Sequence, residues 1–220
     1  MNFTQWGIEP GALLSGALVT LGLAAISIVL GQVLGLGLAL LRRQQFPVLG
    51  PLLAAYISVT RATPLLTLTL AVFFITPALG YDISAAAAAV LAMSINTSAF
   101  NCEIWRGGFA AFPRDQVDAA KAAGMGATLR LRRIVLPQVA RQVMPMLVNE
   151  MTILIKNSPA VAVIGIVELT RTAVRIGANT YRPLPPLIAA LLLYIVIIWL
   201  VVAVQRHLER RGRKQVERLT

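Results

Sequence analysis

Charged and amide side chains that could bind a ligand lie inside an apolar stretch near residue 150 of the 220-residue chain. Glu150 and Asn157 are seven residues apart and so share one face of a helix, whereas Lys156 lies about 120° around that helix from Glu150. A carboxylate at mid-membrane costs roughly 2.5 to 3.5 kcal/mol on insertion scales, so such a group usually faces a pathway or a partner. This pattern favours a binding role for Glu150 and Asn157, while Lys156 can snorkel toward the cytoplasmic face or contact a carboxylate.

A stripe of polar residues recurs at helical spacing one segment earlier, from Ser94 to Asn101. Hydrogen bonds between membrane helices contribute on average under about 1 kcal/mol each. For the Ser and Thr residues of the stripe, such bonds are a slightly better explanation than a role in substrate binding. The other interpretation places part of the stripe on a substrate pathway. Its candidate substrate-binding residues are Asn96, Thr97, Ser98 and Asn101.

Glu103 and Arg106 follow at the end of the same segment, where a gate could close. An arginine that snorkels at a membrane boundary is the simpler explanation. The sequence therefore leaves two interpretations of this pair open: a gate, or an arginine that only snorkels at the membrane boundary.

Composition places all these residues in an integral membrane protein. Hydrophobic residues make up 57% of the chain and charged residues 13%, which exceeds what the core of a soluble domain needs. The length suffices for about five or six spans, since one span takes roughly 20 apolar residues. The single cysteine, Cys102, excludes an intramolecular disulfide, and with the single histidine, His207, it cannot form a zinc site unless carboxylates join them.

Apolar runs predict an all-α membrane protein with one transmembrane domain, residues 1–220. Five glycines in the first run, at positions 16, 22, 31, 35 and 37, are typical of helices that pack closely. The second run is interrupted from Arg61 to Pro64, where proline can kink the helix. The predicted spans are residues 12–41, 52–79, 83–102, 144–167 and 187–204.

Basic residues predict the side on which each connection lies, because loops retained in the cytoplasm are rich in Lys and Arg. Residues 1–11 and 78–84 contain none, whereas the connection after the third run and the tail contain most of them. We therefore expect the N-terminus outside, without the basic region of a cleavable signal peptide, and the C-terminus in the cytoplasm. One connection departs from this rule and can hold a short helix at the membrane interface: residues 168–186 place Arg171, Arg175 and Arg182 on the outer side.

The connection between the third and fourth runs reads DAAKAAGMGATLRLRRIVLP from Asp118 to Pro137, and its pattern predicts two short helices. Asp115 can cap the first helix, with Asp118 three residues later in the manner of a capping box. The other expected boundaries are Gly124 and Gly126 after the first helix, a Thr128 cap on the second, and Pro137 at its end or at the start of the next.

Alanines dominate the first of these helices, where they favour helix and leave the backbone open to close approach. A basic amphipathic helix on anionic lipid headgroups is one interpretation of the segment. Lipid-seeking faces carry large apolar residues, however, whereas small residues suit docking into a protein cleft. We interpret residues 113–137 as a docking loop on the cytoplasmic side.

This loop resembles the EAA loop of ABC importer permeases, which reads EAA, three positions, G, nine positions, I-x-L-P. Here Asp118, Ala119 and Ala120 are followed at the same spacings by Gly124 and by the segment IVLP at 134–137. The one departure is Asp118 in place of Glu, which keeps the charge. The stretches FNCEIWRGGFAAFP before the loop, NEMTILIKNSPAVAVIG after it, and YRP before the last run are similar to permeases of the polar amino acid subfamily, which includes histidine, glutamine, arginine and opine systems.

The resemblance implies a type I ABC importer permease, with five spans, in a bacterial inner membrane. The loop would form coupling helices that dock on a pair of cytoplasmic ATPases, which bind ATP and Mg. A second permease chain, identical or paralogous, would complete the pathway, and an external substrate-binding protein would deliver an amino acid or its derivative to the spans beside the loop, near Glu150. The implied ATPase-coupling residues are Asp118, Ala119, Ala120, Gly124, Ile134, Leu136 and Pro137.

Two other classes of function are weighed against this one. An ion-coupled secondary transporter or channel could use Glu150, but it has no need of the loop spacing, and the chain has no evident internal repeat. A membrane enzyme lacks support, since neither H-E-x-x-H nor G-x-S-x-G occurs. No G-x-x-x-x-G-K-[ST] phosphate loop occurs either, so this chain is expected to bind no ATP or other cofactor itself. The identity of the amino acid stays open.

Overall fold

The structure, a computed structural model, describes residues 9–44 and 46–217, and side-chain environments as far as His207. All regular elements within these residues are helical, which confirms the predicted all-α class. In chain order they are α1 (Pro10–Arg43), α2 (Leu49–Ala62), α3 (Leu65–Ala78), α4 (Ala85–Ala110), α5 (Arg114–Ala122), α6 (Ala127–Arg130), a π-helical turn (Leu131–Val135), α7 (Leu136–Asn157), a 3-10 helix (Ser158–Ile164), α8 (Leu169–Thr180) and α9 (Leu184–Glu217).

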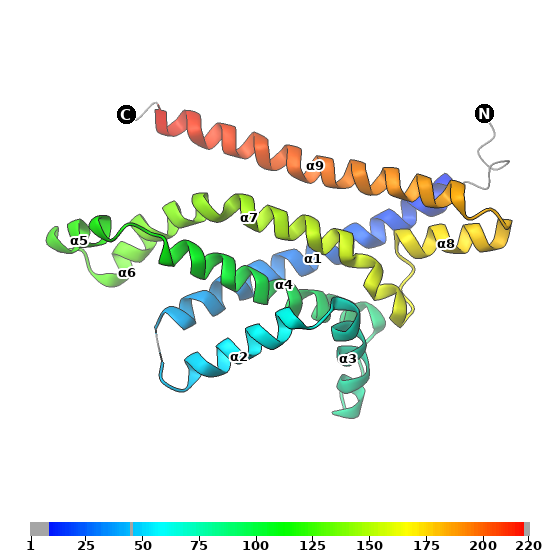
Figure 1. The fold of residues 1–220 in the computed structure, drawn as a ribbon, viewed down its shortest axis with the longest axis horizontal. Helices are drawn as coiled ribbons and strands as arrows, with labels where there is room; N and C mark the ends of the chain where they lie inside the picture. Colours follow the sequence, from blue (N-terminus) through cyan, green and yellow to red (C-terminus); the bar gives the residue numbers. More distant parts are fainter. Residues whose placement is uncertain (1–8, 45, 218–220) are drawn as a thin grey trace.

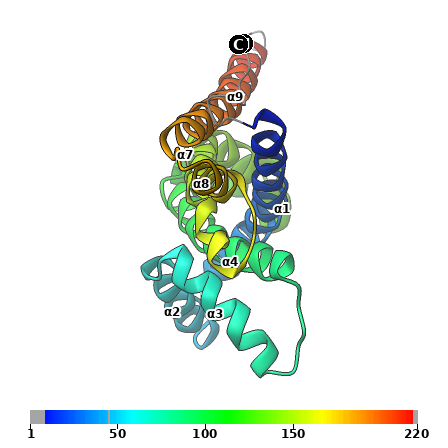
Figure 2. The same ribbon diagram turned by 90° about the vertical axis from the view of Figure 1, so that its right-hand side faces the viewer.

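Helix α4 is the centre of the fold. It packs against α1, α2, α3 and α7, while α8 packs against α1 and α9. The long helices α1, α4, α7 and α9 run roughly along one axis, and α3 projects from their side (Figures 1 and 2). Helices α5 and α6 lie at one end of the molecule and the turn between α8 and α9 at the other. The start of α1 and the C-terminal end of α9 lie at opposite ends of the molecule.

Four helical segments within the described residues are long and apolar enough to cross a membrane, and the α2–α3 pair can supply a fifth span. The segments are Pro10–Arg43, Ala85–Ala110, Ala127–Ile164 and Leu184–His207. Helices α1, α4 and α9 continue past the ends of their apolar runs at residues 41, 102 and 204, where arginines follow. Hydropathy alone marks the middle of a span better than its ends.

The predicted kink in the second span is a complete break. Helices α2 and α3 meet at 114° across Thr63 and Pro64. Thr63 is extended, with φ −89° and ψ 125°, because a residue before proline is disfavoured in the helical region. Pro64 then precedes the first turn of α3. An N–H group at this position would have no partner within the helix, so proline loses no hydrogen bond here. A 28-residue apolar run read as one span is therefore two helices of 14 residues each.

The fourth span begins well before the predicted position 144, inside the connection expected to be a separate loop. The segment Ala127–Ile164 is continuously helical, and Pro137 sits in the first turn of α7, where proline is favoured. The proline ring would clash with the carbonyl four residues earlier in a regular α-helix. The turn widens just before it, and the Leu136 N–H donates to the Leu131 carbonyl five residues back.

Close packing of α1 on α4 depends on Gly31 and Gly35. A Cβ at position 31 would lie 2.0 Å from Thr97 Cγ2, and one at position 35 would lie 2.6 Å from Asn101 Cβ. The predicted role of the glycines in helix packing thus holds at these positions and at Gly16, which faces Thr172 on α8. A Cβ at Gly22 or Gly37 would have no neighbouring atom within 4 Å, so these two glycines make no close helix contact within this chain.

We expect Gly35→Ala to lower the free energy of unfolding by about 1 to 3 kcal/mol, because the new methyl group meets α4 backbone as well as side chain. The measurement is the thermal midpoint of the purified protein in detergent. Gly22→Ala is the control on the same helix and should be neutral or stabilising by up to about 1 kcal/mol. Equal midpoints for the two variants would contradict the packing described here.

Candidate functional site

A cavity of 390 Å³ opens where the α2–α3 break faces α4 and α7. The break supplies its wall from Arg61 to Leu65, α4 supplies Asn96 and Phe100, and α7 supplies Glu150, Ile153 and Asn157. The 114° bend is what brings residues 61–65 to this place. The cavity thus combines one carboxylate, one guanidinium and two amides with apolar walls, which is the usual make-up of a small-molecule site.

Glu150 is the buried carboxylate of this cavity, with 6% of its surface exposed. The Thr97 hydroxyl of α4 hydrogen-bonds to it. Thr97 Oγ1 in turn accepts a hydrogen bond from Asn101 Nδ2 at 3.5 Å. Thr97 of α4 is therefore the polar neighbour between Asn101 and the carboxylate of α7.

Arg61 is the residue of the cavity that the sequence interpretation missed as a binding group. Its guanidinium lies 5.3 Å from the ring centroid of Phe100, a cation–π contact between α2 and α4. Its positive charge also acts on the Glu150 carboxylate. The available signal was an arginine inside an apolar run immediately before a proline break. An arginine and a glutamate around one cavity match the two charges of a zwitterion.

The predicted substrate-binding residues separate into two groups. Asn96, Glu150 and Asn157 line the cavity, and Thr97 reaches it through its bond to Glu150. Ser98 faces elsewhere, since it donates to the Ile95 carbonyl at 2.8 Å and lies 3.2 Å from the Tyr56 hydroxyl. Asn101 is fully buried against α1, and its side-chain hydrogen bond to Thr97 stays within α4. Lys156 is exposed and does not line the cavity.

Glu103 joins two arginines at the end of α4 nearest α5. Arg106, one turn later, donates to Glu103 Oε2 from Nε at 2.9 Å and from Nη2 at 2.8 Å. Arg42 at the end of α1 pairs with the other carboxylate oxygen. The sequence interpretation considered only Glu103 and Arg106, because Arg42 is distant in the chain. The carboxylate therefore fastens α1 to α4.

Helix α5, the first helix of the docking loop, begins differently from the prediction. The capping box proposed for Asp115 and Asp118 is wrong: Pro113 is the N-cap residue, and no side chain caps the helix. Asp118 instead accepts a hydrogen bond from Lys121 Nζ at 2.8 Å, and this bond holds the pKa of the exposed carboxyl below its usual value. Pro113 is extended, with φ −60° and ψ 125°, and the helix begins at the next residue, Arg114.

Gly124 ends the first helix as predicted. Its φ of +76° is a left-handed conformation that glycine adopts without strain. The turn is closed by hydrogen bonds from Gly124 N to the Lys121 carbonyl at 2.9 Å and from Met125 N to the Ala120 carbonyl at 3.0 Å. Ala120 is buried, at 5% exposure, whereas Ala119 and Gly124 are exposed. The exposed surface at this turn is made of small residues.

Helix α6 follows with Gly126 as its N-cap, so the predicted Thr128 cap is wrong. Leu129 is exposed at the start of this helix. Ile134 and Leu136 are half-buried on the continuous segment that follows, and Pro137 is exposed. The resemblance motif thus covers α5, a tight turn and the first turns of the α7 span.

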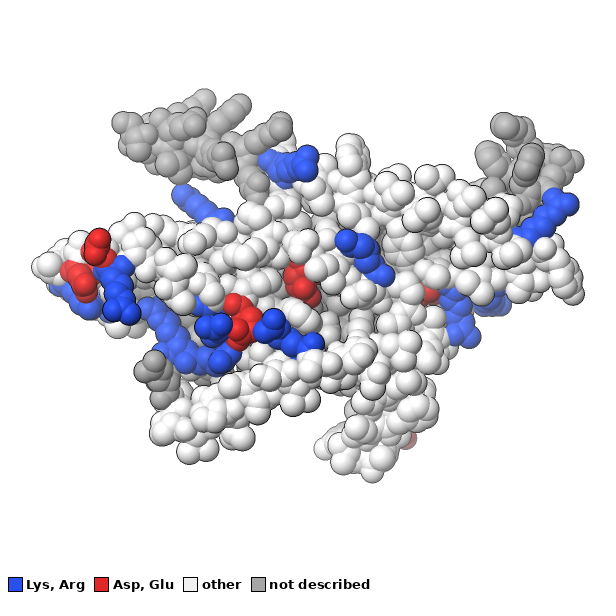
Figure 3. Space-filling model, viewed as in Figure 1, with Lys and Arg blue, Asp and Glu red and all other residues white. Residues whose placement is uncertain are grey.

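The charges of the molecule gather at the α5–α6 end. Figure 3 shows Lys and Arg side chains over α5, α6 and the adjoining helix ends, with a smaller basic group at the α8 end.

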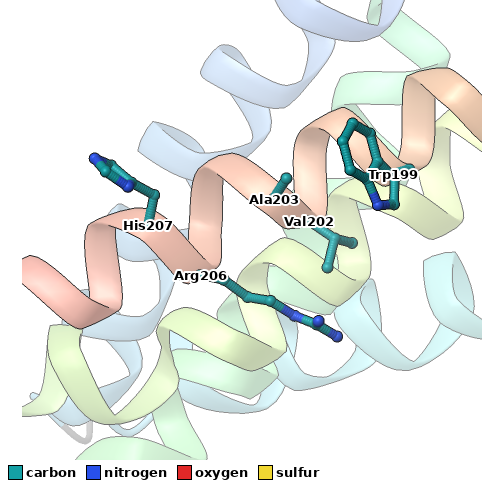
Figure 4. Close-up of a pocket in the computed structure, with 5 residues that line it drawn as sticks. All are labelled: Trp199, Val202, Ala203, Arg206 and His207. Carbon is teal, nitrogen blue, oxygen red and sulfur yellow. The ribbon is translucent and has the colours of Figure 1, made fainter.

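A second hollow, of 320 Å³, lies along α9 and is lined by Trp199, Val202, Ala203, Arg206 and His207 (Figure 4). All five come from one helix, so no second element builds this hollow into a site. Among the described residues, no three His, Cys, Asp or Glu side chains gather as metal ligands.

Comparison with known proteins gives consistent matches over most of the chain. Residues 31–214 match the family described as binding-protein-dependent transport system inner membrane component. The arginine transport system permease protein of Bacillus subtilis is 36% identical over 200 residues, which cover 90% of this chain and 91% of that protein. The octopine transport system permease protein of Rhizobium radiobacter is 36% identical over 202 residues, 86% of this chain and 81% of that protein.

Solved structures give the same result. The crystal structure of an amino acid ABC transporter with histidines contains a chain that is 33% identical, with a TM-score of 0.84, and the match covers 91% of this chain and 94% of that one. A chain of the inward-facing MetNI methionine ABC transporter has a TM-score of 0.78 at 17% identity, covering 96% of this chain and 98% of that one. This second likeness concerns the fold alone.

Proposed function

Because this chain belongs to the family of binding-protein-dependent transport system inner membrane components, we propose that its cavity carries a polar amino acid or an amino-acid derivative across the membrane. The chain is a permease of an ABC transport system, as its relatives are. The ion-coupled carrier considered from the sequence has no support among them.

The observation that carries the substrate proposal is the pairing of Glu150 and Arg61 around one cavity. A zwitterionic amino acid can place its ammonium group against Glu150 and its carboxylate toward Arg61. Asn96 and Asn157 offer amide donors and acceptors for a polar side chain. The relatives named for arginine and octopine transport handle substrates with these same charged groups.

Energy for transport comes, in this proposal, from a pair of separate ATPases that bind ATP and Mg and dock on α5 and α6. The exposed small residues around Ala119 and Gly124 allow a partner to approach the backbone closely. The helical segment from Ala127 to Ile164 runs without interruption from the proposed docking surface to Glu150 and Asn157. A push on α6 is transmitted directly to the cavity wall.

A second permease chain, identical or paralogous, completes the pathway, and an external binding protein supplies the substrate. The basic α5–α6 end faces the cytoplasm by the rule that retained loops are rich in Lys and Arg. The N-terminus is then outside a bacterial inner membrane and the C-terminus inside. The pairing of Glu103 with Arg42 supports a structural role for Glu103 and Arg106 over that of a gate.

We expect Glu150→Gln to leave assembly intact and to reduce uptake by about tenfold or more, because hydrogen bonds to charged groups contribute roughly 1.5 to 3 kcal/mol. The measurement is initial uptake of radiolabelled amino acid into proteoliposomes against substrate concentration. Lys156→Gln, an exposed neighbour outside the cavity, is the control and should transport normally. Unchanged kinetics for Glu150→Gln would remove this residue from the site.

We expect Gly124→Asp to insert normally but to lose its ATPase partner, because a charged side chain would occupy the surface of close approach. Aspartate tolerates the left-handed conformation better than most residues, so the turn should survive. The assay is mass-spectrometric identification of ATPase copurified with the tagged chain after gentle solubilisation.

Gly80→Asp provides the matched control for this experiment. Gly80 also has a positive φ, +85°, and open space around it, but it lies in the α3–α4 connection. The control should retain the ATPase. Normal copurification with Gly124→Asp, or equal loss with both variants, would refute the docking role of the α5–α6 turn.

A further inference from the structure

The cavity at the α2–α3 break contains a balanced pair of charges. Glu150 contributes one negative charge and Arg61 one positive charge, and the other eight residues that line the cavity are uncharged. Glu150 is thus the one carboxylate among the described residues of the cavity wall. The formal charge of the wall is therefore zero.

Two side-chain amides in the same cavity, those of Asn96 and Asn157, have no partner in the chain. Neither amide forms a hydrogen bond with any described residue. Asn96 is only 8% exposed, so its amide has also lost most of its contact with water. A buried polar group without a partner is unfavourable, and a ligand that hydrogen-bonds to it removes that cost. The two amides are therefore available to bind the side chain of a substrate.

An amide group on the substrate is the best complement to these two side chains. The asparagine side chain donates hydrogen bonds through its NH₂ group and accepts them through its carbonyl oxygen. A second amide does both in return, whereas a guanidinium or ammonium group only donates and an ionised carboxylate only accepts. Asn157 lies two turns of α7 beyond Glu150, about 10 Å along the helix. A substrate can therefore reach one of the amides with its side chain while its ammonium group stays near Glu150.

A charged substrate side chain would have no counterpart in this cavity. The ammonium and carboxylate groups that every amino acid carries already use the charges of Glu150 and Arg61. A basic side chain would add a positive charge without a second carboxylate to pair with it. An acidic side chain would likewise add a negative charge without a second guanidinium. Burial of an unpaired charge is unfavourable, so both classes are disfavoured.

We propose that this cavity selects amino acids with an uncharged amide side chain, such as glutamine, over basic and acidic amino acids. The inference deepens the proposed function and rests on it, because it takes this cavity as the transport site. Glu150 and Arg61 bind the groups that all amino acids share. Asn96 and Asn157 bind the side chain and so determine the specificity.

The test measures binding to the assembled transporter in lipid nanodiscs, without the external binding protein. Omission of that protein ensures that its own selectivity does not enter the measurement. The probes are L-glutamine, L-alanine, L-arginine and L-glutamate, and the readout is the dissociation constant from isothermal titration calorimetry. We expect glutamine to bind about tenfold more tightly than each of the other three, because alanine lacks the amide and the other two add an unpaired charge.

Asn157→Asp is the first variant, and it adds a carboxylate of nearly the same size to the cavity. The guanidinium of arginine then gains a counterpart, so the affinity for arginine should rise about tenfold while that for glutamine falls. Lys156→Gln is the matched control, because it makes the same change in net charge at the preceding residue, outside the cavity. This control should bind all four probes as the wild type does.

Asn96→Leu is the second variant, and it replaces the buried amide with an apolar side chain of similar size. The advantage of glutamine over alanine should fall several-fold, because glutamine loses a hydrogen-bond partner that alanine never had. A thermal midpoint close to that of the wild type shows that this variant folds. Asn157 is exposed, so Asn157→Asp keeps the test valid even if Asn96→Leu does not fold.

The remaining outcomes separate failure of this inference from failure of the proposed function. Equal affinities for glutamine and alanine, tighter binding of arginine or glutamate by the wild type, or an equal shift with Lys156→Gln would overturn the amide selectivity alone. Absence of binding by all four probes, or affinities that Glu150→Gln leaves unchanged, would overturn the proposed transport site and this inference with it.

Discussion

The close contact between α1 and α4 is the interaction on which the rest of the structure depends. Gly31 and Gly35 let the two helices approach until side chains of α4 touch the α1 backbone. This contact sets the rotation of α4, and with it the direction of its polar residues. Thr97 has its methyl group against Gly31 and its hydroxyl toward Glu150 of α7. A buried carboxylate between membrane helices is tolerable only when such a partner is held in place.

The broken span gives this carboxylate its counterpart. A continuous second span would leave Arg61 within an unbroken helix, whereas the break at Thr63 and Pro64 turns residues 61–65 toward α4 and α7. The Phe100 ring then holds the guanidinium by a cation–π contact. Proline thus does more than end a helix, because it makes one wall of the cavity. The opposite wall belongs to the continuous helix that begins at the docking surface.

The sequence predicted what depends on composition and local spacing. The all-helical membrane class, the end of the first loop helix at Gly124 and the shared face of Glu150 and Asn157 all follow from residue type and helical period. The sequence could not predict contacts between distant segments. Arg42 was missed as a partner of Glu103, and Arg61 as a cavity residue, because each meets its partner only after folding. The helix caps failed for a different reason: Pro113 and Gly126 begin their helices by backbone conformation, so the expected Asp115 and Thr128 caps are not needed.

The central claim is that one cavity, bounded by the broken span and the continuous helix, holds the transported amino acid. An electron-microscopy structure of the assembled transporter, saturated with its transported amino acid, tests this most directly. The account predicts ligand density between Glu150 and Arg61, with the ammonium group toward the carboxylate and the substrate carboxylate toward the guanidinium. Ligand density elsewhere along the pathway, with these two side chains unchanged from the ligand-free state, would contradict it.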